Sequence, residues 1–301
     1  MINSIIVRYS EIGIKGKNRV LFEKKLVSNI KRFFKKNSLE YQKISRKTGR
    51  IIIEIQKYAS GMEYLKNVFG IISFSPSMRT NADIEDIKNK ISFFLQGFCE
   101  NENFRISADR ITKTSSFSSM DIEREIGAFV VEKTKCRVKL KNFDKEIGIE
   151  IIGDSAYVFD RKIRCFGGLP VGIEGKAISY LDSERMDASI VASLLAMKRG
   201  ISLIFASTER TENVDTSSLE KFCFSKNKIF VANSLSDLAE LAEKQGINAV
   251  ICPDTIEDMK ARTSNNIENN IENIKEECTF LMPLVAFNNG EITELMSKFG
   301  V

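Results

Sequence analysis

Histidine is absent from the 301-residue sequence. Its absence removes the most frequent general base and metal ligand of proteins, so Ser-His-Asp and Cys-His catalysis are excluded. The six cysteines are widely spread and include no Cys-x-x-Cys pair. Nothing in their spacing therefore indicates a disulfide framework or a zinc site, and we expect no metal.

Long apolar runs are also missing, because no stretch reaches the roughly 18 apolar residues that a membrane-spanning helix needs. Residues 1–9 contain Arg8 and are typical of a strand rather than of a signal peptide with a long apolar body. The composition, 43% apolar and 28% charged, is ordinary for a globular protein. We therefore expect a cytoplasmic protein that does not bind a membrane.

The charges are unevenly distributed along the chain. Residues 1–76 carry 16 Lys and Arg against 5 Asp and Glu, whereas residues 77–169 carry 16 against 15. Residues 170–301 carry 13 Lys and Arg against 20 Asp and Glu. A polyanion is attracted by the first segment and repelled by the last, so the distribution favours a nucleic acid as partner of the N-terminal part.

The first segment, residues 1–76, alternates strand and helix patterns. Residues 3–9 and 51–55 read as strands, the apolar spacing over 22–34 predicts a helix, and residues 62–68 predict a shorter one. This order predicts a small two-layer α/β unit.

The second segment, residues 77–169, repeats this mixture. Helical apolar spacing predicts two helices, and short alternating stretches predict strands. The helices are expected at 84–98 and 122–130, and the strands at 104–108, 138–140, 147–151 and 157–159.

The last segment, residues 170–301, follows a Gly-Gly-Leu-Pro turn at 167–170 and alternates strands with helices. Such alternation predicts a doubly wound parallel sheet with helices on both faces. The strands are expected at 177–181, 201–206, 228–232 and 247–252, and the helices at 186–199, 235–244 and 292–299, with a biased polar stretch at 264–277.

Several segments in order resemble one family, the tRNA sulfurtransferases that form 4-thiouridine, some of which also serve thiamine biosynthesis. The matching segments are Val-Arg-Tyr-Ser-Glu-Ile-Gly-Ile-Lys-Gly-Lys-Asn-Arg at 7–19, Val-Phe-Gly-Ile-Ile-Ser-Phe-Ser-Pro at 68–76, the stretch 104–127, Gly-Gly-Leu-Pro-Val-Gly at 167–172, and shorter pieces at 196–200 and 281–286. The resemblance implies an α/β and α+β multidomain fold. We expect an N-terminal ferredoxin-like domain at 1–76, a THUMP RNA-binding domain at 77–169, and a shortened ATP-pyrophosphatase-like domain at 170–301.

The resemblance implies that the first two domains bind tRNA and that the protein is a homodimer. Cationic side chains that contact phosphates supply most of the affinity that does not depend on sequence. Glycines beside the cations at 15–19 free that loop to approach a phosphate closely. The candidate RNA-binding residues are Lys15, Lys17, Asn18 and Arg19 in this loop and Arg105, Arg110 and Lys113 in the THUMP segment. A solvated surface charge is the alternative for each of the cations.

The sequence departs from the family where the nucleotide should bind. The family has a Ser-Gly-Gly-x-Asp-Ser loop, whose glycines let backbone N–H groups at a helix N-terminus approach phosphate. Residues 181–189 here read Leu-Asp-Ser-Glu-Arg-Met-Asp-Ala-Ser, so Glu184 and Arg185 replace the two glycines. We expect Ser183, Asp187 and Ser189, with Asp254 at a later strand end, to be vestiges of the nucleotide site.

None of the six cysteines aligns with the catalytic cysteine of the family. The sequence therefore predicts a tRNA-binding homologue without catalytic residues and without a cofactor. Two alternatives remain. In one, the altered loop still uses ATP for 4-thiouridine synthesis and a separate carrier supplies sulfur. In the other, the acidic last segment docks a partner enzyme beside bound tRNA.

Overall fold

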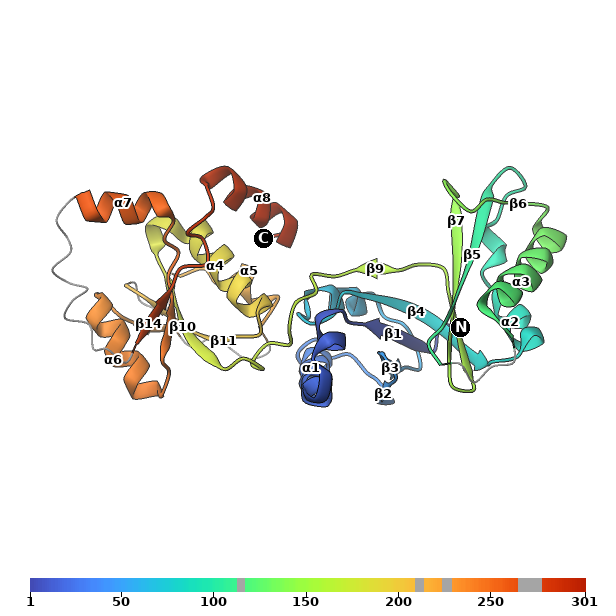
Figure 1. Cartoon of the computed structure of the whole chain (residues 1–301), viewed down its shortest axis with the longest axis horizontal. Helices are drawn as coiled ribbons and strands as arrows, with labels where there is room; N and C mark the ends of the chain where they lie inside the picture. The colour runs from blue at the N-terminus through green and yellow to red at the C-terminus, as the bar shows by residue number, and fades with distance from the viewer. Residues whose placement is uncertain (113–116, 209–213, 224–228, 265–277) are drawn as a thin grey trace. The chain divides into compact units, whose positions relative to one another are not determined.

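The computed structural model describes residues 1–112, 117–208, 214–223, 229–264 and 278–301. Its N-terminal strands form a four-stranded antiparallel arrangement in the order β2-β3-β1-β4, which is the strand order of a ferredoxin-like domain (Figure 1). The elements are β1 Ser4–Arg8, two 3-10 turns η1 Glu11–Ile14 and η2 Gly16–Asn18, α1 Arg19–Lys36, β2 Lys43–Lys47, β3 Arg50–Glu54, η3 Ser60–Asn67 and β4 Ser73–Asn81.

The THUMP-like segment continues the same sheet. Strand β4 pairs with β1 through residues 73–77 and with β8 through residues 78–81, so one nine-stranded sheet includes both segments. The expected boundary between residues 76 and 77 falls inside β4 and remains a prediction. The further elements are α2 Ile84–Ile91, η4 Leu95–Gly97, β5 Asn103–Arg110, α3 Ser119–Thr134, β6 Arg137–Val138, β7 Lys145–Ile152, β8 Ser155–Phe159 and β9 Ile163–Arg164.

Helices α2 and α3 cover one face of strands β5, β7 and β8 (Figure 1). Phe104 and Ile106 of β5 point to this face and are almost fully buried with Ile122 and Ile126 of α3. Strand residues of the other parity, such as Arg105, therefore point to the opposite face, which is not covered by any helix of the described residues. The core thus fixes which side chains of the sheet are free to bind a ligand.

A buried carboxylate joins the two halves of the sheet. Glu150 of β7 accepts from Arg8 Nε at 2.6 Å and from Arg50 Nε at 2.7 Å. Burial opposes ionisation of Glu150, but the two guanidinium groups outweigh it and lower the pKa of this carboxyl. Arg8 also donates to Ser75 Oγ and lies over the Phe159 ring, which ties the start of the chain to the THUMP-like strands.

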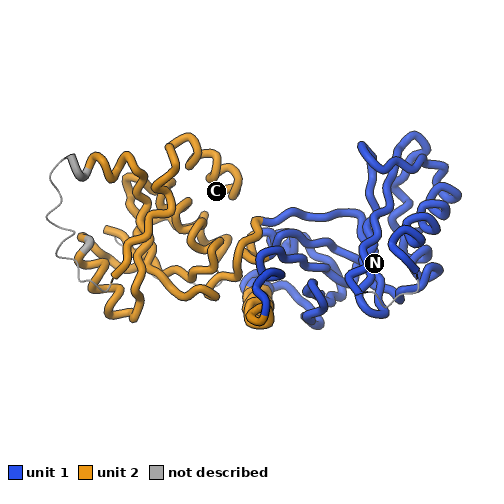
Figure 2. The backbone as a smooth tube through the Cα atoms, viewed as in Figure 1, with its two compact units in different colours: residues 1–16, 33–66, 71–165 blue, residues 17–32, 67–70, 166–301 orange. Residues whose placement is uncertain are grey.

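The chain forms two compact units (Figure 2). Unit 1 comprises residues 1–16, 33–66 and 71–165, and unit 2 comprises 17–32, 67–70 and 166–301. Phe69 belongs to unit 2, where its ring stacks on Phe222 at 5.3 Å between centroids and also contacts Phe166 and Phe299. The expected boundary after residue 169 also remains a prediction.

Unit 2 contains a five-stranded parallel sheet in the order β12-β11-β10-β13-β14, as the strand-helix alternation predicts. Helices α4 and α8 pack on Ala177 and Ile251 on one face, and α6 packs on Ile178 and Val250 on the other. The elements are β10 Lys176–Leu181, η5 Ser183–Arg185, α4 Met186–Lys198, β11 Ser202–Ser207, α5 Ser217–Glu220, β12 Ile229–Val231, α6 Leu235–Gln245, β13 Ala249–Ile251, α7 Ile256–Ser264, β14 Thr279–Leu281 and α8 Asn289–Phe299.

The expected fold class is confirmed, with local corrections. The helix expected over 84–98 is wrong in length, because α2 ends at Ile91 and the chain continues through turns into η4. Residue 228 and most of the stretch 264–277 lie outside the described residues. In the part of the chain that the structure describes, no helix is long and apolar enough to cross a membrane.

Candidate functional site

The parallel sheet of unit 2 has a topological switch point between β10 and β13. The chain leaves β10 toward β11 and β12, and later returns to place β13 on the other side of β10. Ligands of open α/β sheets bind at such a point, beyond the carboxyl ends of the strands. The segments that follow β10 and β13 are 182–189 and 252–258, and they contain every residue expected to be a vestige of a nucleotide site.

Asp182 caps the turn that follows β10. Its Oδ1 accepts from the backbone N–H of Glu184 at 3.1 Å, so a carboxylate of the protein itself takes an N–H at the start of the η5–α4 segment. The first N–H groups of a helix are the donors that would otherwise bind a phosphate. The protein thus uses one of these donors to bind its own anion.

Arg185 joins this turn to the segment after β13. Its Nη2 lies 2.8 Å from Asp182 Oδ2 and 3.2 Å from Asp254 Oδ1, and its Nη1 lies 2.8 Å from Asp258 Oδ2. Asp254 is 2% exposed, whereas Arg185 is 28% exposed. One guanidinium therefore joins carboxylates from the two sides of the switch point, and we call these four residues the Arg185 cluster.

The Arg185 cluster keeps its guanidinium charged. Burial acts to lower the pKa of Arg185, but the carboxylates of Asp182 and Asp254 outweigh it and raise this pKa. Three carboxylates face one cation here, and Glu184 adds a further exposed carboxylate. An excess of negative charge and an occupied N–H group do not fit a triphosphate in the way that a glycine loop does.

The structure brings some of the expected vestigial residues together and separates others. Ser189 is fully buried, and its hydroxyl accepts from Asp182 N at 3.0 Å and donates to Arg185 O at 3.1 Å. These two hydrogen bonds stabilise the backbone of the turn. Asp254 lies in the Arg185 cluster, while Ser183 and Asp187 are exposed. Sequence reasoning missed Asp182 and Asp258, although Asp182 directly follows the apolar strand and is in a capping position.

The loop before α1 contains the first group of candidate RNA-binding residues. Lys17 and Asn18 are exposed in η2, Lys15 is half-buried between the two 3-10 turns, and Arg19 begins α1. Gly16 has φ +53, a left-handed conformation that glycine adopts without strain. Arg19 donates from Nε to Glu23 Oε1 at 2.8 Å, so its charge is partly balanced within the helix.

The second group of candidates lies on β5, except that Lys113 lies outside the described residues. Arg105 points to the uncovered face of the sheet, where its Nη1 donates to Leu140 O at 3.5 Å and its guanidinium lies near the Phe143 ring. Arg110 ends the strand within electrostatic reach of Asp121. The two arginines occupy opposite ends of one strand.

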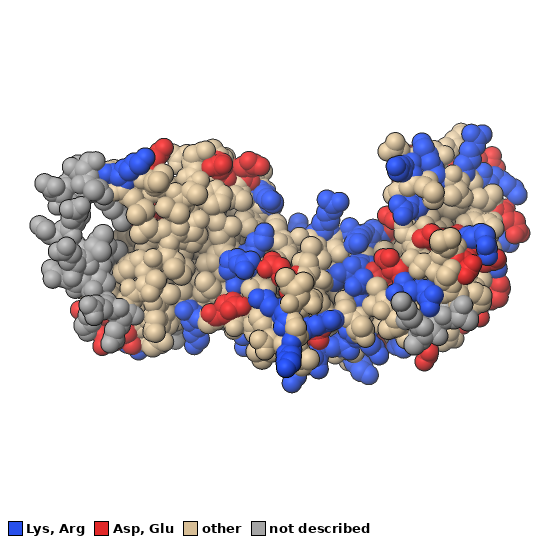
Figure 3. All heavy atoms as spheres, in the orientation of Figure 1, with Lys and Arg blue, Asp and Glu red and all other residues tan. Residues whose placement is uncertain are grey.

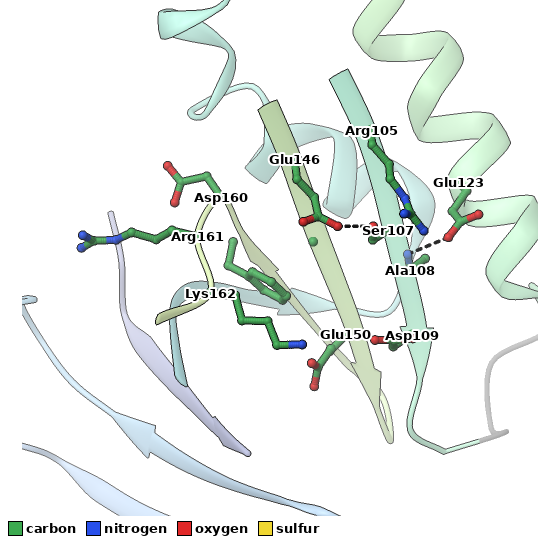
Figure 4. A pocket seen from close by; sticks show the side chains of 12 residues that line it. Arg105, Ser107, Ala108, Asp109, Glu123, Glu146, Glu150, Asp160, Arg161 and Lys162 are labelled. Carbon is green, nitrogen blue, oxygen red and sulfur yellow. Dashed lines mark hydrogen bonds between the residues drawn. The ribbon is translucent and has the colours of Figure 1, made fainter. Parts of the chain in front are cut away.

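A polar cavity of about 270 Å³ lies beside Arg105 on the uncovered face (Figure 4). Strands β5 and β7 supply Asp109, Glu146 and Glu150, and the segment after β8 supplies Lys162. Glu146 accepts from Ser107 Oγ, which holds this carboxylate over the strand. The cavity has more carboxylates than cations along its wall, so it suits groups that donate hydrogen bonds better than it suits phosphates.

The fold and these sites define a class of protein, namely a ferredoxin-like and THUMP front end joined to an α/β domain of the ATP-pyrophosphatase type. Residues 4–75 match the ThiI ferredoxin-like domain family, and residues 81–160 match the THUMP domain family. The chain belongs to the tRNA sulfurtransferase family.

Two curated relatives illustrate the similarity. The chain is 37% identical over 210 residues to the probable tRNA sulfurtransferase of Thermococcus kodakarensis. The aligned region covers 68% of this chain and 55% of that protein. It is 29% identical over 338 residues to the probable tRNA sulfurtransferase of Methanobrevibacter smithii. That alignment covers 98% of this chain and 86% of the relative. The chain thus spans about half the length of the Thermococcus protein.

Two solved structures share the fold over the whole chain. The crystal structure of PH1313 from Pyrococcus horikoshii Ot3 matches with a TM-score of 0.85 and 32% identity, and the match covers 99% of this chain and 100% of that one. A 4-thiouridine synthetase–RNA complex with bound ATP matches with a TM-score of 0.79 and 26% identity, covering 100% and 85% of the two chains.

Proposed function

We propose that this protein binds tRNA through its ferredoxin-like and THUMP domains and that its α/β domain does not activate the tRNA with ATP. The observation that carries this proposal is the Arg185 cluster. In this cluster, Asp182 accepts a hydrogen bond from the backbone N–H of Glu184, and Arg185 bridges Asp182 to Asp254 at the switch point. A triphosphate would have to displace these contacts and approach at least three carboxylates.

The charge distribution supports tRNA as the partner. Residues 1–76 carry 16 cations against 5 carboxylates, and Lys17 is exposed beside the left-handed Gly16. One solved structure of the family contains RNA. We assign phosphate contacts to Lys15, Lys17, Asn18 and Arg19, because cations near flexible glycine backbone suit a polyanion. We assign them to Arg105 and Arg110 as well, because these are the cations of strand β5 in the THUMP domain.

Two measurements on the purified full-length chain test the proposal. Filter retention of total tRNA across a salt series should show tight, salt-sensitive binding that ATP does not change. Calorimetric titration with ATP should show no binding in the micromolar range, and adding tRNA should release no pyrophosphate. Micromolar ATP binding with tRNA-dependent pyrophosphate release would overturn the loss of catalysis, whereas absence of tRNA binding would overturn the RNA assignment.

A matched variant sharpens the test for ATP. Replacing both Glu184 and Arg185 by glycine removes the bridging guanidinium and restores small residues to the turn. If side chains block the phosphates, this variant should bind ATP more tightly than the wild type. A double replacement of exposed residues on α6, Glu240→Gly and Lys244→Gly, controls for general loosening of the domain and should leave ATP binding unchanged.

The alternative function is ATP-dependent 4-thiouridine synthesis with a separate sulfur carrier. Its support is the ATP-bound family structure, which matches this chain at 26% identity. Nucleotide contacts would then come from Ser183, Asp187 and Asp254, and the Arg185 cluster would have to open. Less 4-thiouridine in cellular tRNA after deletion of the gene would establish this alternative, and unchanged levels would reject it.

A further inference from the structure

The edge of the THUMP sheet carries a regular series of cations that the candidate residues above do not include. From the C-terminal end of α3, Lys133, Lys135, Arg137, Lys139 and Lys141 occupy every second position. All five residues are exposed. We infer that Lys135, Arg137, Lys139 and Lys141, here called the β6 edge, bind the phosphate backbone of tRNA. This inference rests on the proposed tRNA binding and extends it to a new surface.

The backbone of the β6 edge is held in place although its side chains are exposed. Lys139 N donates to Phe104 O at 2.9 Å, and Asp144 N donates to Asn103 O at 2.9 Å. Arg105 supports the same segment, because its guanidinium reaches Leu140 O and lies near the Phe143 ring. A surface whose backbone is already ordered loses little conformational entropy when it binds.

The register places Arg137 on the uncovered face. Arg137 pairs with Asn103 in the parallel ladder between β6 and β5, so it shares a face with Asn103 and Arg105. Cys136, of the opposite parity, is buried in the core beneath the helices. Figure 3 shows Lys and Arg side chains at the end of unit 1 that carries β6 in Figure 1.

Among the cations of the β6 edge, Lys139 lies within electrostatic reach of Asp144 and helps to lower the pKa of that carboxyl. Within the described residues, none of the four cations of this edge is within ion-pair distance of a carboxylate. Lys88 and Lys244, which are also on the surface, do pair with Glu85 and Glu240 of their own helices. Unpaired cations spaced along one edge favour a polyanion over a partner with both signs of charge.

Lysines on an edge strand also prevent edge-to-edge aggregation, and this role alone would predict no effect on RNA binding. The two roles are separated by the salt dependence of tRNA affinity. Each phosphate contact contributes about 0.7 to 0.9 to the slope of log affinity against log salt concentration. Loss of three or four contacts should therefore reduce the slope by about 2 to 4.

The experiment compares tRNA binding by filter retention for the wild type and three variants. The edge variant carries Lys135→Gln, Arg137→Gln, Lys139→Gln and Lys141→Gln, and the charge-conserving variant carries Lys135→Arg, Arg137→Lys, Lys139→Arg and Lys141→Arg. The control variant removes four exposed lysines of unit 2, with Lys176→Gln, Lys244→Gln, Lys260→Gln and Lys298→Gln. Circular dichroism melting curves verify that each variant is folded.

We expect the edge variant to lose affinity by roughly tenfold or more near 100 mM salt and to show the smaller slope, since lost phosphate contacts reduce both. The charge-conserving and control variants should bind as the wild type does. Equal affinity and slope for the edge variant and the wild type would reject the β6 edge but leave the proposed function standing. Failure of the wild type itself to bind tRNA would reject both.

Discussion

Arg185 and Asp254 form an ion pair across the switch point of the α/β sheet, with Nη2 and Oδ1 3.2 Å apart, although 69 residues separate them in sequence. Asp254 is nearly inaccessible to solvent, and the Arg185 guanidinium places a positive charge beside this buried side chain. A buried charge that loses its partner is strongly destabilising. The contact therefore stabilises the folded α/β domain at the same place where it hinders a nucleotide.

Replacing Arg185 by Gln should lower the free energy of unfolding by about 3 kcal/mol, because it removes the guanidinium that bridges the buried Asp254 to Asp182 and Asp258. Urea unfolding followed by circular dichroism measures the change. The matched control is Arg124→Gln in α3, whose ion pair with Asp121 is exposed, so its loss should change the stability little. Equal effects of the two replacements would contradict a structural role for the Arg185 cluster.

Glu150→Gln should lower the free energy of unfolding by about 3 kcal/mol at neutral pH, because Arg8 and Arg50 then lose the buried carboxylate that both of them bind. The folded state lowers the pKa of Glu150, so its contribution is complete above the pKa of the unfolded chain. It is lost as the pH falls through the lower folded value. The difference between wild type and variant should therefore shrink below about pH 4.

Urea unfolding at a series of pH values from neutral to acid measures this difference. Glu125→Gln, which removes an exposed carboxylate of α3, serves as the control and should change stability by less than about 0.5 kcal/mol. A difference between wild type and Glu150→Gln that stays constant down to strongly acid pH would show that the ion pairs with Arg8 and Arg50 do not explain the effect.

The elements that could be predicted are those with an apolar face of their own. Leu26 and Ile30 recur at helical spacing and are fully buried in α1, and the apolar stretch at 147–151 is strand β7. Strand β2, with the sequence Lys-Ile-Ser-Arg-Lys, was missed because it is an exposed edge with one apolar residue. Strand β2 is defined by its hydrogen bonds to β3. An apolar pattern in the sequence cannot predict such an exposed edge strand.

Strand β4 was missed for a different reason. It contains Pro76, which argues against a central strand because proline donates no hydrogen bond. Pro76 is tolerated because residues 73–77 pair with β1 whereas β8 begins to pair only at Met78.

The altered residues at 184 and 185 could be found by comparison with the family. The partners Asp254 and Asp258 of Arg185 follow only from the strand order, which brings the two segments together.

Gly148→Ala should destabilise unit 1 by about 1 to 3 kcal/mol through overpacking. A Cβ atom at residue 148 would overlap the ring of Phe159, which is also in contact with the Arg8 guanidinium. Gly127→Ala in α3 is the matched control, because no atom lies within 4 Å of the added Cβ. It should stabilise the helix by about 0.5 to 1 kcal/mol. Thermal unfolding measures the change in Tm of each variant relative to the wild type. Equal shifts in Tm for the two variants would contradict the packing argument.

Cysteine alkylation should separate the thiols by burial. Cys99 is exposed, whereas Cys136 and Cys252 are buried, and burial raises the pKa of Cys165 to about 12. Because the thiolate is the nucleophile, Cys165 should be almost unreactive at pH 8. Iodoacetamide should therefore modify Cys99 first, and peptide mass spectrometry over time measures the order. In urea all six should react at similar rates. Modification of Cys165 in the folded protein as fast as that of Cys99 would show that the β9 segment opens readily, contrary to its pairing with β4.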